Sequence, residues 1–175
     1  IVPHLPSLVE GAIDNILATI FAGSQYRMFE HAFFFVLSRD KAYVPNYWLF
    51  QSLVRSWRET QGAAADLPIA AWTTRNGRKD LAPLFSVYAD FVAQASPGAI
   101  AHKIRALPDT RQRELVLEYL LRVPSTPEDL SETFALYDEF APAAHQVERS
   151  FLAARLAVSR SDWAAAVENA AMAQD

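Results

Sequence analysis

The sequence predicts an all-α protein, an irregular helical bundle or solenoid of about eight helices joined by short loops. Three observations predict this fold class. Apolar residues recur at three- and four-residue spacing through most of the 175-residue chain. Proline or a capping residue precedes most of these apolar runs, as at helix starts. No run alternates apolar and polar residues convincingly enough to predict a strand.

Three helices are expected in the first 60 residues. The segment from Leu5 to Phe21 gathers its apolar residues on one face. The segment 25–37 is apolar nearly all round, which predicts a helix that is buried on every side and is the most buried element of the fold. Pro45 opens the third helix, whose core stripe consists of Tyr47, Phe50, Leu53, Val54 and Trp57.

The apolar pattern lapses between residues 60 and 80, where a short helix is expected around Ala70–Thr73. We interpret residues 1–175 as one domain, and a boundary inside it would fall in this loop. Beyond the loop, clear start signals predict the remaining helices. These signals are Pro83, Ser96-Pro97, Asp109 with Gln112, Thr126 to Asp129, Pro142, and Ser161-Asp162.

One stretch carries small residues at positions where two helices would approach closely. In residues 153–173, Ala154 precedes a turn formed by Ser161, Asp162 and Trp163, and Ala166 and Ala173 follow it. This pattern resembles the inner part of a tetratricopeptide repeat, although Ser161 replaces the usual glycine and the closing proline is missing. The resemblance implies a helical hairpin that serves protein–protein interaction and has no catalytic activity of its own. An ordinary alanine-rich hairpin is the alternative.

The last predicted helix has more apolar surface than one neighbour can cover. We expect its contact with the preceding helix to use Trp163, Ala166, Val167 and Ala170. This leaves Ala164, Ala165, Ala171 and Met172 as a predicted partner-binding face. The expected occupant is a protein partner, a continuation of the same chain, or a second copy in a homodimer.

Composition excludes several other classes of function. The chain has no cysteine, so a disulfide framework, a thiolate metal site and a cysteine nucleophile are all excluded. Its 5 glycines form no phosphate-binding loop, and its histidines follow no metal-ligand spacing, so we expect neither cofactor nor metal. Residues 109–175 hold 12 acidic against 6 basic side chains, which disfavours nucleic acid. No apolar run is long enough to span a membrane, and we expect a cytoplasmic protein.

Two polar clusters are candidate sites. Glu30 and His31 interrupt the most apolar helix and are the candidates for a catalytic pair. Because adjacent residues point about 100° apart on a helix, they are not expected to face one pocket, and Arg27 offers a local ion pair instead. The second cluster is a candidate anion-binding patch, or alternatively a solvated loop rim, formed by Arg55, Arg58, Arg75, Arg78 and Lys79.

These observations favour a helical interaction or scaffolding domain of a larger protein. The alternative is a helical-bundle enzyme or a small-ligand-binding domain built around the aromatic helix 25–37.

Overall fold

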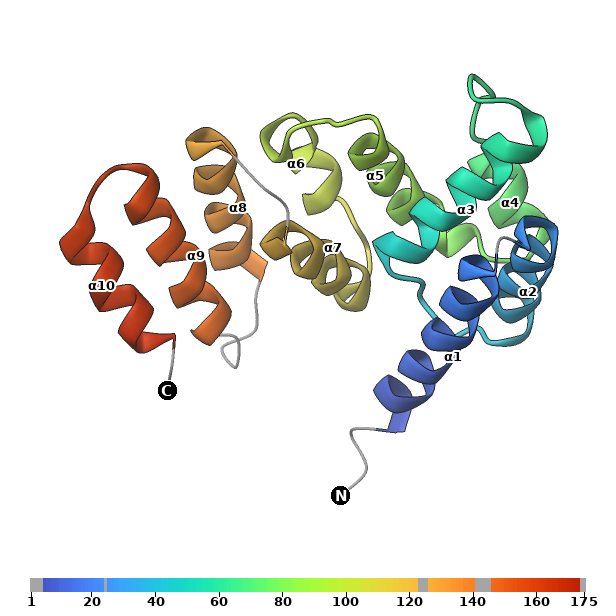
Figure 1. Ribbon diagram of the computed structural model, residues 1–175, viewed down its shortest axis with the longest axis horizontal. Coiled ribbons are helices and arrows are strands. Elements are labelled where there is room, and N and C mark those ends of the chain that lie inside the picture. The colour runs from blue at the N-terminus through green and yellow to red at the C-terminus, as the bar shows by residue number, and fades with distance from the viewer. Residues whose placement is uncertain (1–4, 24, 123–125, 141–145, 174–175) are drawn as a thin grey trace. The chain divides into compact units, whose positions relative to one another are not determined.

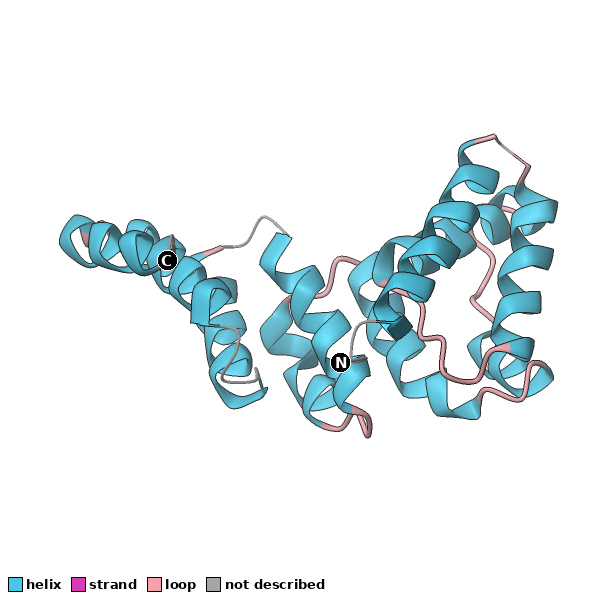
Figure 2. Ribbon diagram, turned by 90° about the horizontal axis from the view of Figure 1, so that it is seen from below, coloured by secondary structure: helices cyan, strands magenta, loops and turns pink. Residues whose placement is uncertain are grey.

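The computed structural model describes residues 5–23, 25–122, 126–140 and 146–173, and this part of the chain is all-α with no strand (Figure 2). The all-α prediction is therefore confirmed. The chain divides into two compact units, Ile1–Ala93 and Gln94–Asp175. The division follows Ala93, whereas the loop 60–80 lies inside the first unit.

The N-terminal unit contains five α-helices among its described residues (Figure 1). They are α1 (Leu5–Ala22), α2 (Tyr26–Arg39), α3 (Tyr47–Gln61), α4 (Ile69–Arg75) and α5 (Ala82–Val92), with a 3-10 turn η1 at Lys79–Leu81. The short helix expected around Ala70–Thr73 is α4. Helix α3 packs on α1, α2 and α5, so its apolar side chains lie at the centre of this unit.

Aromatic rings fill this core. The Phe50 ring of α3 lies 5.0 Å from Phe85 and 5.5 Å from Tyr88 of α5, measured between ring centroids. On the other side, Phe21 of α1 meets Phe29 of α2 edge-on at 5.3 Å. Offset and edge-on ring pairs are favourable beyond the area that they bury, so these contacts hold α1, α2, α3 and α5 together.

Helix α2 is less buried than its composition predicts. Only its stripe of Phe29, Phe33 and Leu37 is buried, while Met28 and Phe35 are exposed, the latter by 62%. The prediction of burial on every side is wrong because other helices cover only one face of α2.

The C-terminal unit contains α6 (Pro97–Arg105), α7 (Thr110–Arg122), α8 (Pro127–Phe140), α9 (Gln146–Ser159) and α10 (Trp163–Met172). Helices α9 and α10 form an antiparallel hairpin, and α8 packs beside α9 (Figure 1). Buried Tyr137 of α8 belongs to this core, and burial, together with Glu148 and Glu118, raises its pKa to about 12. Pro142, the predicted start of α9, lies outside the described residues.

The predicted helix starts of this unit are occupied by side-chain caps. Asp109 accepts a hydrogen bond from the backbone N–H of Gln112, and Asp162 accepts one from Ala165. Thr126 and Asp129 bond to each other's backbone N–H groups, which is a complete capping box. Each cap satisfies N–H groups that have no acceptor within their own helix.

Candidate functional site

The predicted pair Glu30 and His31 lines a single hollow of about 330 Å³, which we call the aromatic hollow. It lies among α2, α3 and α4 and is walled by Phe34, Trp57 and Trp72. The expectation that the two residues would not face one pocket is wrong, because the hollow is wide enough to be reached from adjacent positions of α2. Its volume is at the low end of the range for small-ligand sites.

The Glu30 carboxylate has a partner on a neighbouring helix. Its Oε1 accepts a hydrogen bond of 2.8 Å from the hydroxyl of Ser56, which is fully buried on α3. The same hydroxyl lies 3.0 Å from the main-chain oxygen of Tyr26, so one proton is shared between two acceptors. Among the described residues, Arg27 forms no ion pair with Glu30 or His31, so the contact of Glu30 joins α2 to α3.

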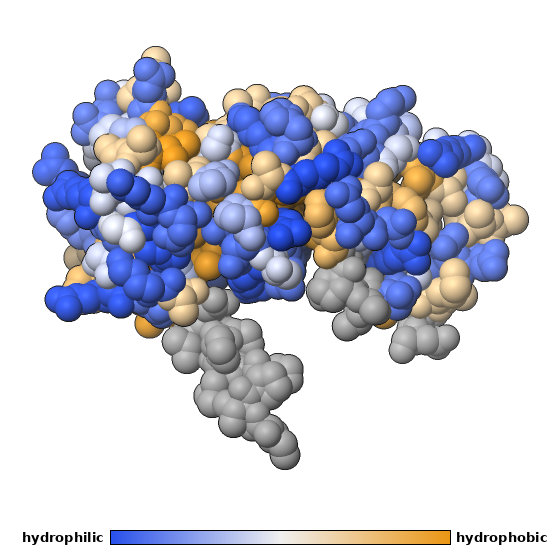
Figure 3. Space-filling view, turned by 180° about the vertical axis from the view of Figure 1, so that it is seen from behind, coloured by the Kyte–Doolittle hydropathy of each residue, from blue (hydrophilic) through white to orange (hydrophobic). Residues whose placement is uncertain are grey.

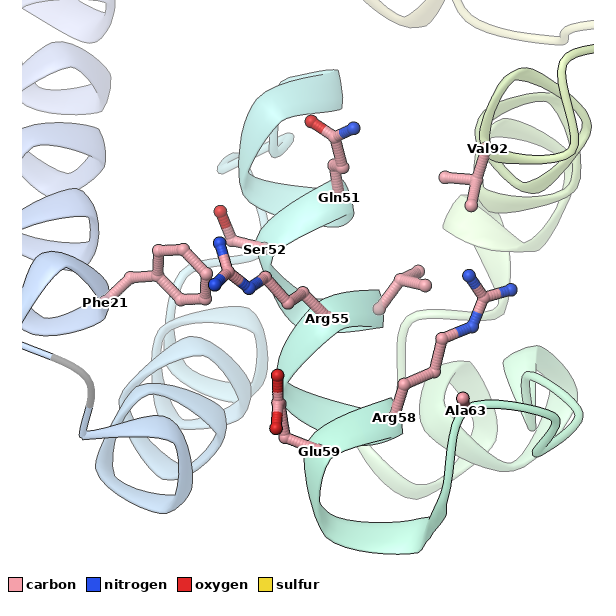
Figure 4. Close-up of a pocket in the computed structure, with 9 residues that line it drawn as sticks. Phe21, Gln51, Ser52, Arg55, Arg58, Glu59, Ala63 and Val92 are labelled. Carbon is pink, nitrogen blue, oxygen red and sulfur yellow. The ribbon is translucent and has the colours of Figure 1, made fainter.

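The residues of the predicted basic patch lie at separate sites in the N-terminal unit. Arg55 and Arg58 line a groove of about 670 Å³ on the exposed face of α3, whereas Arg75 lines the aromatic hollow. In Figure 4, Arg55 extends over Phe21 of α1 and Arg58 extends toward Val92 of α5, so the two guanidinium groups diverge. The Arg55 group lies 5.7 Å from the centre of the Phe21 ring, a cation–π contact. Lys79 is exposed in η1 and lines neither cavity.

Arg78 belongs to the core, which corrects its assignment as an anion-binding residue. It is 1% exposed, and its Nη1 donates to the main-chain oxygens of Tyr43, at 2.8 Å, and Asp40, at 3.2 Å. Its Nε and Nη2 face the carboxylate of Asp80 at 3.0–3.2 Å. The guanidinium group thus ties the loop after α4 to the loop after α2, and no ligand can reach it.

In the C-terminal unit, an apolar groove of about 640 Å³ runs between α9 and α10. Helix α9 contributes Phe151, Ala154, Arg155 and Val158, and α10 contributes Ala166 and Ala170. A second hollow of about 660 Å³ shares Phe151 and Arg155 with it and extends to Val147. Apolar side chains reach the surface over these helices, on the right of Figure 3.

The α9 residues of this surface form a helical stripe. Val147, Phe151, Ala154 and Val158 are spaced by four, three and four residues, and the three larger side chains are 45–48% exposed. The stripe lies outside the buried face of α9, which carries Leu152 and Ala157. The sequence of α9 carries apolar residues on two faces, and only one of these faces packs within the unit.

One charged side chain sits at the junction of the two hollows. The Nη1 of Arg155 donates a hydrogen bond of 2.9 Å to the main-chain oxygen of Leu121, near the end of α7. Its guanidinium carbon lies 5.7 Å from the centre of the Phe151 ring. These contacts hold the guanidinium group at the edge of both hollows, and Glu148 lines the second of them.

The outer part of α10 differs from its predicted packing. Ala166 is buried against α9 as expected, but Trp163 is 65% and Val167 is 71% exposed, so neither is covered by that helix. Of the predicted partner-binding face, Ala164, Ala171 and Met172 are exposed and Ala165 is partly buried. The exposed apolar surface of this hairpin is therefore larger than the predicted partner-binding face.

Within the described residues, no three His, Asp or Glu side chains converge as a metal site requires. No described helix combines the length and the apolar character that crossing a membrane demands. No family model matches the chain, and neither does any curated protein or solved structure.

Proposed function

We propose that the C-terminal unit is a cytoplasmic protein-interaction module that binds a helix of a partner protein in the apolar groove between α9 and α10. The observation that carries this proposal is the stripe from Val147 to Val158, three of whose side chains are about half exposed. Contiguous apolar surface bordered by polar residues is typical of interaction sites. The tetratricopeptide-like pattern of residues 153–173 supports the same function, because Ala154 and Ala166 both line the groove.

The dimensions of the groove favour an amphipathic helix as the occupant. The eleven residue steps from Val147 to Val158 correspond to about 16 Å along the helix axis, at 1.5 Å per residue. A partner helix of about three turns presents apolar side chains at matching positions i, i+4, i+7 and i+11.

The test is a selection of displayed helical peptides against the whole chain, followed by affinity measurement with purified variants. We expect selected peptides to share the apolar spacing. Phe151→Ala should weaken them about 30-fold, equivalent to the 2 kcal/mol that marks an interface hot spot.

Trp163→Ala is the matched control, since Trp163 is an exposed aromatic residue of the same hairpin that does not line the groove. It should leave the affinity of the selected peptides unchanged. The proposal is overturned if Phe151→Ala and Trp163→Ala weaken binding equally. It is also overturned if Phe151→Ala abolishes only self-association, because the occupant would then be a second copy.

A further inference from the structure

The aromatic hollow of the N-terminal unit is independent of the groove between α9 and α10, and it has a defined long axis. Glu30, Phe34 and Ser38 line it from successive turns of α2. The eight residue steps from Glu30 to Ser38 correspond to about 12 Å along the helix axis. A ligand lying in the hollow therefore follows α2.

The two ends of this axis carry opposite charges. At one end is the Glu30 carboxylate, held by the Ser56 hydroxyl beside Trp57. At the other end are Arg75 and Asn76, placed near the C-terminal end of α2 because Lys41 Nζ donates a 3.0 Å hydrogen bond to the Asn76 main-chain oxygen. Among the described residues, Arg75 has no hydrogen-bond or ion-pair partner, so its guanidinium group remains open to a ligand.

The middle of the hollow is aromatic and rigid. The Trp72 ring lies 6.0 Å from Phe34 and 5.6 Å from Trp57, the latter nearly perpendicular at 87°. Trp72 is buried, and the Trp57 indole N–H donates to the Asp66 main-chain oxygen at 3.1 Å. Both rings are thus held in place before any ligand arrives, and they offer an apolar surface between the two charged ends.

We propose that this hollow binds a short peptide of about three residues with free ends. Its ammonium group pairs with Glu30, its carboxylate pairs with Arg75, and an apolar side chain rests on Trp57 and Trp72. Three extended residues span about 10–11 Å, close to the length of α2 that lines the hollow. A single amino acid carries both charges on one carbon and cannot reach both ends.

The experiment is calorimetric titration of the whole chain with the tripeptide Ala-Leu-Ala. Further titrations use its N-acetylated form, its C-amidated form and free leucine. We expect saturable binding of the free tripeptide and at least tenfold weaker binding of each blocked form and of leucine. Glu30→Gln should bind the free and acetylated peptides equally, and Arg75→Gln should bind the free and amidated peptides equally. Glutamine at position 30 keeps an oxygen that can accept the hydrogen bond from the Ser56 hydroxyl.

Arg58→Gln is the control, because Arg58 is an exposed arginine of the same unit that lines a different cavity. This variant should distinguish the free and blocked peptides as the wild type does. The proposal is overturned if the free and blocked peptides bind with the same affinity, or if the wild type shows no saturable binding at millimolar concentration. It is also overturned if Arg58→Gln and Arg75→Gln behave alike. Phe151→Ala should leave tripeptide binding unaffected, so this test and that of the helix-binding groove succeed or fail separately.

Discussion

Replacing Arg78 by methionine tests whether a buried guanidinium group holds the N-terminal unit together. Methionine has a similar length and keeps most of the apolar packing, so little cavity forms. What it removes are the donors to the main-chain oxygens of Tyr43 and Asp40. These carbonyl groups come from the loop that leads from α2 into α3.

The expected loss of unfolding free energy follows from the hydrogen bonds that Arg78→Met removes and from the carbonyl groups that then have no donor. A hydrogen bond from a charged donor contributes about 1.5–3 kcal/mol, and a buried carbonyl without a donor costs about 1–3 kcal/mol. The Asp80 side chain is 55% exposed, so its ion pair with Arg78 adds at most about 1 kcal/mol. Relief of the desolvated charge offsets part of the loss. We therefore expect Arg78→Met to lower the free energy of unfolding by about 3 kcal/mol.

Urea unfolding followed by circular dichroism measures this change, with Asp80→Asn as the matched variant. Arg78→Met should shift the midpoint downward with an unchanged slope, and Asp80→Asn should shift it by no more than a third as much. If Asp80→Asn costs as much as Arg78→Met, the ion pair dominates and the carbonyl contacts are secondary. A midpoint for Arg78→Met equal to that of the wild type would refute the reasoning altogether.

Two further predictions concern stability. Phe33→Ala should lower the free energy of unfolding in urea by about 3–5 kcal/mol, because Phe33 is fully buried. Phe35→Ala should lower it by less than about 1 kcal/mol, because Phe35 is exposed. Equal costs for the two variants would contradict the one-sided burial of α2. The other prediction concerns stability at alkaline pH. The pKa of Tyr137 is about 12 in the folded state and about 10 in the unfolded state. The folded state therefore holds this proton more tightly. The resulting stability is complete below pH 10 and about 2–3 kcal/mol of it is lost as the pH rises to 12. Tyr137→Phe should lose less stability over this interval, and identical pH profiles for the two proteins would contradict the raised pKa.

Local signals predicted the helices and their starts well. Asp109, Thr126 and Asp162 cap the helices at the predicted positions, because a cap depends on residues only two or three apart. Even α4 was expected from a short run between turn signals. Such features need no knowledge of the rest of the fold.

Which face of each helix packs against a neighbouring helix could not be predicted from the sequence. Apolar spacing shows that Phe35 and Phe151 suit burial, but not whether another helix lies on their side, and both are exposed. The role of Arg78 depends on acceptors 35 and 38 residues away, which no local pattern indicates. The aromatic hollow likewise requires side chains from three helices, although Glu30 and His31 were recognised individually.

The last prediction concerns the turn between α9 and α10, where a local sequence pattern and the packing of two helices both act. Ser161 stands where the tetratricopeptide pattern has glycine, and its φ of 59° is left-handed. The N–H of Ser161 donates to the oxygen of Val158 and that of Asp162 to Ala157, the paired bonds of a Schellman motif with Ser161 at the left-handed position. A side chain there costs about 1–2 kcal/mol, and the greater freedom of glycine in the unfolded chain offsets about 0.4–1 kcal/mol of the gain.

Ser161→Gly should therefore stabilise the C-terminal unit by about 0.5–1 kcal/mol, which a higher urea midpoint would reveal. Ala153→Gly, in the interior of α9, should destabilise the unit by about 1 kcal/mol, because glycine there gains no conformational relief. The same replacement residue thus has opposite effects at two positions eight residues apart. If both variants lower the midpoint, the left-handed turn is not strained by its serine. The hairpin would then owe its geometry to the packing of α9 on α10 rather than to the turn.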